Sequence, residues 1–332
     1  MTKNLPLIRL SAINPFLLEL ERRKVNAQPL LESLELPMTI PASNDLFVAS
    51  TTVYELVEEA AKLADDRFLG FSIGSALDLK SWDPIADAAK RAATVGELLT
   101  LFIVNAADHS SATQFYISTV AERTTFGLKR VVEPPFRPGQ NDAFYMGFMS
   151  RLLKRATIDH WDASKVLFRV ADPECIPNAG GSYRIVQGGR SGVEITFPSH
   201  WLFERFESNQ MLSASGKNVF DDMPRSILDS VRTALQPRLQ DLDLTVDKAA
   251  RICGYDRRRL SRELRGQGTT ISKEIAKLRA EQASRKLVDT DDRVADIAQS
   301  VGFADPTVFS RAFKNWTGQS PQQYRRSQRS PG

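Results

Sequence analysis

Two short stretches near the carboxyl end gather side chains that can bind nucleic acid. At helical spacing, one face of each stretch is cationic or polar. The first face carries Arg257, Arg258, Arg259, Ser261, Arg262 and Arg265, and the second carries Thr307, Val308, Ser310, Arg311, Lys314 and Asn315. Guanidinium groups bind phosphates or guanine, hydroxyl and amide groups bind bases or phosphates, and a valine side chain can contact the methyl group of thymine. For each residue, the alternative is contact with phosphate alone or with solvent.

A pair of short helices must position the second face. Apolar residues recur at i, i+3, i+4 and i+7 within residues 294–301, which predicts one amphipathic helix. Gly302 follows, where the end of a helix favours a residue that accepts positive φ. Asp305 suits the N-cap of the next helix and Pro306 suits its first position. Residues 309–316 repeat the apolar spacing with aromatic side chains, so the two helices form a candidate helix-turn-helix.

The same pattern occurs 48 residues earlier in the chain. Residues 246–253 repeat the apolar stripe and Gly254 repeats the stop. Tyr255 takes the position of Phe303, and Asp256 is again a suitable N-cap. This spacing indicates an internal duplication of one helix-turn-helix motif.

A longer helix is predicted between the two copies, over residues 271–287, with Ile275, Leu278 and Leu287 turned inward. A helix of some 16 residues spans about 24 Å. Successive major-groove faces of a duplex are about 34 Å apart. The linking helix can therefore hold two reading helices on one side of a duplex.

Charge is distributed unevenly along the chain. Residues 223–332 contain 21 Lys and Arg against 13 Asp and Glu, a net charge of +8, whereas the preceding 222 residues contain 23 and 27, a net charge of −4. A basic carboxy-terminal third attached to a weakly acidic remainder favours a nucleic-acid-binding module joined to a domain with another task. Solvated helix surface is the alternative.

Residues 223–328 resemble the DNA-binding region of the AraC/XylS family of transcription regulators. The resemblance is carried by the paired motifs, the linking helix and the ending "IAQSVGFADPTVFSRAFKNWTGQSPQQYR", residues 297–325. It implies an all-α domain of seven helices, major-groove binding by the helices that begin near Arg257 and Pro306, and control of transcription at promoters. Three consecutive arginines after the first cap depart from the common pattern and leave the preferred DNA sequence open.

The first 220 residues predict an α+β domain with a partly antiparallel sheet. Helical periodicity covers residues 12–25, 49–65, 84–107 and 141–155. Strand patterns are "TQFYISTV" and "FGLKRVV" as one hairpin, "KVLFRVA" as a strand, and "YRIVQGGRSGVEITF" as a hairpin turning at Gly188-Gly189. This layout resembles more weakly the arabinose-binding-like regulatory domain of a subgroup of the same family, which implies effector sensing, dimerisation or both.

Two features of this domain are candidates for effector binding. Arg151 and Arg155 share one helical face, and together with Arg190 in "GGRSGVEI" they resemble in part the PilZ-domain site for cyclic di-GMP. A solvated basic helix end is the alternative for the two helical arginines. The second candidate is an aromatic set that can line an apolar or sugar-binding cavity or simply form the core, and its members are Phe115, Tyr116, Phe126, Phe136, Phe144, Tyr145, Phe148 and Trp161.

The sequence predicts no catalytic site and no metal site. The phosphate-binding loop, His-Glu-x-x-His and Cys-x-x-Cys are all missing, and the three histidines follow no ligand spacing. Cys175 and Cys253 are far apart and are expected to be buried. We therefore expect no catalytic residues, no metal and no cofactor. Without a signal peptide or a long apolar run, a cytoplasmic protein with no membrane contact is expected.

The sequence thus predicts a multidomain regulator. Its expected parts are an effector-sensing or dimerisation domain over residues 1–215, a linker and helix start over 216–230, and a DNA-binding domain over 231–328. Expected partners are double-stranded promoter DNA, RNA polymerase, a second copy of the chain, and a small-molecule effector that is a sugar, an amino acid or a cyclic dinucleotide. The leading hypothesis is an activator controlled by that effector. The alternative is a ligand-independent regulator whose amino-terminal domain only dimerises or contacts polymerase.

Overall fold

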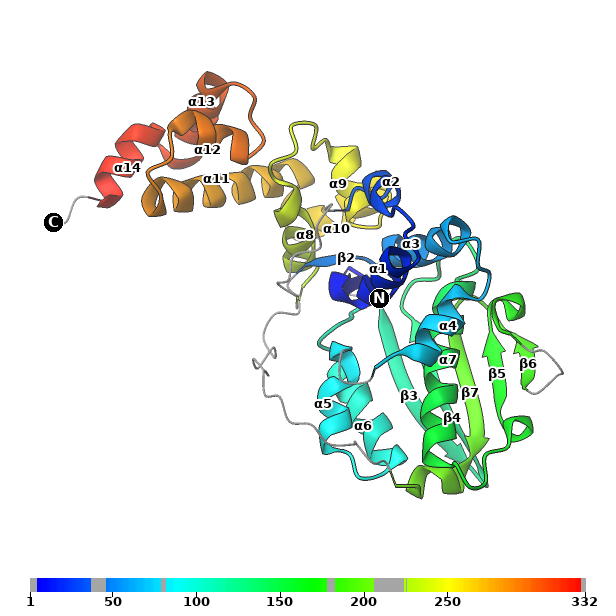
Figure 1. Ribbon diagram of the computed structural model, residues 1–332. Helices are drawn as coiled ribbons and strands as arrows, with labels where there is room; N and C mark the ends of the chain where they lie inside the picture. The colour runs from blue at the N-terminus through cyan, green and yellow to red at the C-terminus, as the bar shows by residue number, and fades with distance from the viewer. Residues whose placement is uncertain are drawn as a thin grey trace. The chain divides into compact units, whose positions relative to one another are not determined.

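The computed structural model describes residues 5–36, 46–78, 82–177, 183–205, 224 and 226–329 (Figure 1). The chain divides into two compact units: Pro6–Met223, called here the amino-terminal unit, and Pro224–Gly332 with Lys3–Leu5, called the carboxy-terminal unit. Residues 216–223 and 225 of the predicted linker lie outside the described residues. Among the helices described, none has the length and hydropathy needed to span a membrane.

The amino-terminal unit is built around a five-stranded sheet. Its strands are β3 (Thr113–Val120), β4 (Arg123–Arg130), β5 (Leu167–Val170), β6 (Arg184–Gln187) and β7 (Gly192–Pro198), in the order β3-β4-β7-β5-β6. Among the described strands, only β5 and β6 pair in parallel. A separate pair is formed by β1 (Leu7–Arg9) and β2 (Phe47–Ala49). The predicted α+β class and the hairpin of the first two long strands are confirmed.

The predicted hairpin turning at Gly188-Gly189 is wrong. The strand that precedes these glycines, β6, pairs with β5 at the edge of the sheet, whereas the strand that follows them, β7, lies between β4 and β5. Burial explains the difference, because Val193, Ile195 and Phe197 of β7 are buried and need neighbours on both sides, whereas three of the four β6 residues are exposed. A two-glycine turn signals a hairpin locally, but here the chain crosses over β5.

The helices of the amino-terminal unit are α1 (Asn14–Arg22), α2 (Gln28–Ser33), α3 (Ser50–Leu63), α4 (Leu69–Ala76), α5 (Asp83–Arg91), α6 (Val95–Ala106) and α7 (Gly139–Ala156). The single helix predicted over residues 84–107 is in fact two, α5 and α6. The break is made by Thr94, whose hydroxyl accepts a hydrogen bond from the Glu97 N–H at 3.2 Å, while the Glu97 carboxylate accepts one from the Ala93 N–H at 2.8 Å. This reciprocal cap begins a new helix.

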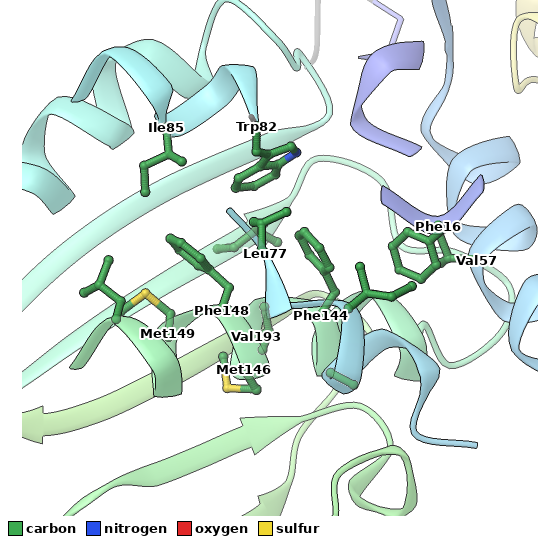
Figure 2. Close-up of a cluster of buried hydrophobic side chains, with 14 of the residues drawn as sticks. Phe16, Val57, Leu77, Trp82, Ile85, Phe144, Met146, Phe148, Met149 and Val193 are labelled. Atoms are coloured by element: carbon green, nitrogen blue, oxygen red, sulfur yellow. The ribbon is translucent and has the colours of Figure 1, made fainter. Parts of the chain in front are cut away.

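Helix α7 lies over one face of the sheet and forms the centre of the core (Figure 1). Its Phe144 and Phe148 pack against Trp82, with ring centroids 5.3 and 5.8 Å apart (Figure 2). Helix α4, which the periodicity did not reveal, packs closely along α7. A side chain at Gly74 would lie 2.0 Å from the Phe144 carbonyl oxygen, so the two backbones approach each other only because glycine stands there.

The carboxy-terminal unit is all helical within the described residues. It contains α8 (Ile227–Leu235), α9 (Val246–Ile252), α10 (Arg257–Gly266), α11 (Ile271–Asp289), α12 (Val294–Ser300), α13 (Pro306–Thr317) and α14 (Pro321–Arg329). Helices α9 and α10 form the first helix-turn-helix, and α12 and α13 form the second. Single-turn 3-10 helices are found in both units, at Leu10–Ile13, Ala163–Lys165, Pro173–Cys175, Ser199–Phe203 and Gln236–Arg238. The predicted arrangement of two motifs joined by a linking helix is confirmed.

Candidate nucleic-acid interface

Caps and glycines fix where α10 and α13 begin. The Asp256 carboxylate accepts a hydrogen bond from the Arg259 N–H at 2.9 Å, and the Asp305 carboxylate accepts one from the Thr307 N–H at 2.6 Å. In the turns before them, Gly254 and Gly302 have φ values of 69° and 77°. Positive φ is strained for residues with a side chain, so glycine allows each turn to remain short. Both helices consequently start at the positions that the sequence predicts.

Apolar contacts turn one face of each helix inward. Leu260 and Leu264 of α10 and Phe309 and Phe313 of α13 are completely buried. The Phe303 ring packs against Phe309 with centroids 5.6 Å apart. Because these anchors occupy one side of each helix, the opposite side faces outward and presents the polar and cationic residues.

The outward face of α13 is largely solvent-exposed. Thr307, Val308, Arg311, Lys314 and Asn315 are exposed. Ser310 is half-buried, and its hydroxyl donates to the Pro306 carbonyl at 2.8 Å, so only its acceptor capacity remains for a ligand. Arg311 has no salt-bridge partner among the described residues.

The outward face of α10 is less uniform. Arg258, Arg262 and Arg265 are exposed. The exposed Arg257 lies 3.2 Å from the Asp247 carboxylate. By contrast, Arg259 and Ser261 are half-buried, and the guanidinium carbon of Arg259 lies 4.2 Å from the centroid of the Tyr255 ring. Arg258 and Arg262 are therefore better placed to contact DNA than Arg259, which already stacks on the turn. The DNA-contact residues remain predictions.

Arg279 of α11 connects the two motifs. One of its terminal nitrogens donates to the Asp241 carbonyl of the first half at 3.0 Å, and its guanidinium carbon lies 5.4 Å from the centroid of Phe303 in the second half. Helix α11 has 19 residues. At 1.5 Å per residue it is about 28 Å long. Arg279 thus links the segment before the first motif to the turn of the second motif.

The arginines proposed for an effector are not brought together. Arg151 donates to the Ser75 carbonyl at 2.9 Å, and Arg155 is exposed in the last turn of α7. Arg190 instead donates to the Pro135 carbonyl at 2.8 Å. Its own carbonyl accepts from Arg130, which binds Asp142 in the first turn of α7. At 1.5 Å per residue, Arg151 and Arg155 lie about 14 and 20 Å further along α7 than Asp142, whereas the Arg190 backbone lies near Asp142.

Most of the predicted aromatic set forms the core. Five members contact one another or the rings of Phe102 and Trp82, two residues outside the predicted set. These members are Phe115, Phe126, Phe144, Tyr145 and Phe148. Phe136 also packs on this core. Tyr116 lies on the opposite face of the sheet, where its hydroxyl donates to Glu194 at 2.7 Å, and Trp161 stacks on Trp201. The set therefore does not form one cavity.

Several buried polar residues were not predicted from the sequence. Arg130 donates to the Asn141 side chain at 2.9 Å and also binds Asp142, whose other oxygen accepts from the Ala171 N–H at 2.8 Å. The Tyr54 ring lies beside Arg130, 5.2 Å from its guanidinium carbon. These residues come from four separate segments, so no local spacing could have revealed them.

Both cysteines are buried, as predicted. Burial raises the pKa of each thiol to about 12. Since the thiolate is the reactive form, neither side chain is suited to redox or ligand chemistry at neutral pH. No cluster of three or more His, Cys, Asp or Glu side chains suited to a metal occurs among the described residues.

Known families match both units. Residues 249–327 match a helix-turn-helix domain, and residues 25–180 match the family described as the arabinose-binding domain of AraC transcription regulator, amino-terminal. The chain is 34% identical over 99 residues to the transcriptional activator NphR of a Rhodococcus species, covering 30% of each chain. It is 35% identical over 104 residues to the ornithine utilization regulator of Pseudomonas aeruginosa, covering 31% of this chain and 30% of that protein.

Among solved structures, the carboxy-terminal domain of AraT, a response regulator from Geobacillus stearothermophilus, is 32% identical with a TM-score of 0.29, covering 30% of this chain and 84% of that one. The chain spans about 30% of the length of the two curated relatives named above. Those relatives, and the family that residues 25–180 match, are named as transcription regulators and not as enzymes, which agrees with the prediction of a non-enzymatic function.

Proposed function

Because the chain belongs to the AraC family of transcription regulators, we propose that it binds specific promoter DNA through α10 and α13 and regulates transcription from that site. The observation that carries this proposal is the pair of capped helices with buried apolar faces and outward cationic faces. Helices of this kind enter the major groove by their amino-terminal ends. Early residues such as Arg258, Thr307 and Val308 would then meet base edges.

Phosphate binding and base reading fall to different residues in this proposal. Arg262, Arg265 and Lys314 lie late in their helices and would hold phosphates, which supplies affinity without sequence preference. Arg258 and Arg311 would select guanine, and Val308 would contact the thymine methyl group. The remaining predicted contacts, Arg257, Arg259, Ser261, Ser310 and Asn315, would support either role.

The link through α11 supports simultaneous binding of two grooves. A helix of about 28 Å is close to the roughly 34 Å between successive major-groove faces on one side of a duplex. Fixing the two motifs before DNA arrives lowers the entropy lost on binding. The two reading helices would thus engage adjacent turns of one site.

Control by an effector completes the proposal. The match of residues 25–180 to an arabinose-binding-like domain supports a sensing role for the region we assign to residues 1–215, with a linker over 216–230 and DNA binding by 231–328. We propose that the effector favours the arrangement that binds DNA and that the protein acts as a cytoplasmic, homodimeric activator in contact with RNA polymerase. A ligand-independent regulator is the alternative, for which the amino-terminal unit would only dimerise or contact polymerase.

The reading residues are tested by the affinity of the full-length protein for the DNA upstream of its own gene. We expect Arg258→Ala and Arg311→Ala each to weaken binding by about fivefold or more, because a bidentate contact to guanine contributes about 1–3 kcal/mol. The matched control is Arg91→Ala, which removes an exposed arginine from the amino-terminal unit. Fluorescence anisotropy in one buffer gives all four dissociation constants. Unchanged affinity in both variants would show that these helices do not read the DNA.

A further inference from the structure

The five-stranded sheet of the amino-terminal unit has two dissimilar edge strands, β6 and β3 (Figure 1). Strand β6 has four residues and begins with Arg184. Strand β3 has eight residues, "TQFYISTV", with no charge and no proline. Its pairing with β4 runs without a bulge from its first residue to its last. Proteins protect edge strands from pairing with other chains by shortness, charge, proline or bulges, and β3 has none of these protections.

The outer edge of β3 carries unpaired backbone groups. In an antiparallel pair, alternate residues turn their N–H and C=O groups toward the neighbouring strand. The Ala112 carbonyl accepts from the Val131 N–H at 2.9 Å, and this pair continues the register of β3 with β4. Even-numbered residues of β3 therefore bond to β4, and odd-numbered residues turn their groups outward. No hydrogen bond to these outward groups is found among the described residues, and the residues that carry them are Thr113, Phe115, Ile117 and Thr119.

Neighbouring elements leave this edge open. Strand β1 occupies an outward group only before β3 begins, where the Ser111 N–H donates to a carbonyl of β1 at 2.9 Å. Helix α6 packs on one face of β3, with the ring centroids of Phe102 and Phe115 4.8 Å apart. On the other face the Tyr116 ring lies across β4, because its hydroxyl reaches Glu194 of β7 at 2.7 Å. The outward groups of β3 are therefore open to another strand.

A second copy of β3 complements this edge. When two copies meet in antiparallel orientation about a two-fold axis at Tyr116, Thr113 of each lies opposite Thr119 of the other, and Phe115 lies opposite Ile117. Each of these four residues has one N–H and one C=O, so all the outward groups of both chains are paired. Phe115 and Ile117 are half-buried in one chain. Cross-strand pairs of an aromatic and a β-branched residue stabilise sheets, so the new contact also covers apolar surface.

The ends of β3 select this register. After Val120 the chain turns at Ala121, which has a φ of 50°. In the symmetric arrangement this turn lies opposite Ser111, where β1 already occupies the edge. A shift of two residues would place Thr119 opposite Ser111 in one direction, or Thr113 opposite the turn in the other, and fewer groups would be paired. Identical strands also bring identical side chains close to the axis, and β3 has no charge that would oppose this.

We propose that two copies of the chain dimerise by antiparallel pairing of β3 with β3, which joins their two sheets into one. This inference rests on the proposed function, because it assigns a surface to the homodimer proposed there. The surface lies wholly within the amino-terminal unit. Dimerisation therefore does not require DNA and can be measured without it.

Sedimentation velocity of the full-length protein at several concentrations measures the dimer. Thr119→Pro removes an outward N–H and keeps the bonds of β3 to β4, because an edge strand accepts proline where the N–H points away from the sheet. By symmetry two hydrogen bonds between the chains are lost, and we expect the dissociation constant to rise about tenfold or more. Thr119→Ala is the matched control. It keeps the N–H and loses only a hydroxyl that bonds to Thr124 within one chain at 2.9 Å, so the dimer should be nearly unchanged.

An engineered disulfide tests the register. The two copies of Tyr116 face each other across the axis as a non-hydrogen-bonded pair, with Cα atoms about 4.5 Å apart, which a disulfide can span. Tyr116→Cys is therefore expected to form a covalent dimer on mild oxidation. Ser118→Cys is the matched control, because its two copies would be about 14 Å apart. Both natural cysteines are buried, so the introduced thiol is the accessible one among the described residues.

Three results would overturn the proposal. They are a protein that stays monomeric at the highest concentration reached, a dimer that Thr119→Pro does not weaken, and cross-linking of Ser118→Cys as fast as that of Tyr116→Cys. If thermal unfolding shows that Thr119→Pro does not fold, the two cysteine variants decide the question. Failure of the proposed DNA binding is separate, because it would appear as Arg258→Ala and Arg311→Ala variants with unchanged DNA affinity.

Discussion

The carboxylate of Glu58 faces the amino-terminal end of α7, where it accepts a hydrogen bond from the Gln140 N–H at 2.7 Å. Burial raises the pKa of this carboxyl to about 7, and the negative charges of Asp142 and Asp172 contribute in the same direction. The helix end attracts the negative charge, but the loss of hydration outweighs that attraction. Glu58 therefore changes charge near neutral pH, unlike an ordinary surface glutamate.

The pH dependence of stability follows from the direction of this shift. The folded-state pKa lies above the unfolded value, so the folded state holds the proton more tightly, and stability falls as pH rises from about 4.5 to about 7. Glu58→Gln removes this dependence and keeps an acceptor for the Gln140 N–H. We expect its stability relative to the wild type to increase between pH 5 and pH 8 by at most about 3 kcal/mol.

Urea unfolding at several pH values measures the Glu58 effect. Glu55→Gln is the matched control, because Glu55 is exposed on the same helix one turn earlier. A constant difference between Glu58→Gln and the wild type across this pH range would show that Glu58 does not titrate abnormally.

At the scale of elements, the turns of the carboxy-terminal unit show two different uses of glycine. Gly302 and Gly318 have nearly the same φ, 77° and 79°. A Cβ at Gly302 would lie 2.5 Å from the Leu239 carbonyl oxygen, whereas one at Gly318 would meet nothing within 4 Å. Gly318 thus satisfies only the backbone, while Gly302 also lets the second motif approach the segment before α9.

Alanine at these two glycines separates the two effects. Gly318→Ala is expected to destabilise the protein by about 1 kcal/mol, the cost of a side chain in the left-handed region. Gly302→Ala adds a clash with a backbone atom, and we expect a further loss of about 1–3 kcal/mol. Chemical denaturation followed by helical circular dichroism measures both. Equal losses would mean that the Leu239 contact is not constrained in solution.

The elements differ in whether they could be predicted from the sequence. The helix-turn-helix motifs were predictable because their signals, such as Gly302 and Asp305, lie within a few residues of the structure they cause. The pairing of β6 with β5 was not predictable, because it depends on residues that are distant in sequence. Helix α4 was missed because Gly70 and Gly74 lower helix propensity although they allow contact with α7.

The candidate sites also differ in whether they could be predicted from the sequence. The outward faces of α10 and α13 could be predicted as the sides opposite an apolar stripe. The buried group of Tyr54, Arg130 and Asp142 could not be predicted, because each residue comes from a different segment and only the fold brings them together.

At the scale of the whole molecule, net charge separates the carboxy-terminal third, at +8, from the rest, at −4. Cations attract DNA through the release of counterions, so affinity falls steeply as salt rises. The acidic remainder adds no such attraction. The proposed division between phosphate-binding and base-reading residues can therefore be tested by salt.

Arg262→Gln and Val308→Ala should respond differently to salt. If Arg262 binds phosphate, its loss lowers the slope of log affinity against log salt by about 0.9 and weakens all sequences alike. Val308→Ala should leave the slope unchanged and weaken only the preferred sequence, because it removes a base contact. Anisotropy titrations at several salt concentrations, on specific and scrambled DNA, give both quantities. A lower slope for Val308→Ala would place the α13 start on the phosphate backbone.

The two helix-turn-helix motifs follow one another along the chain as similar but unequal copies. The first contains Tyr255 and three consecutive arginines, and the second contains Phe303 and Thr307-Val308. A pair related by two-fold symmetry reads a palindrome, which is the same from either end. A tandem pair joined by one helix instead reads an asymmetric site, and the order of the two motifs along the duplex has a polarity. Bound as proposed, a single chain would distinguish upstream from downstream, so reversing the site within a promoter would reverse the way the rest of the protein points.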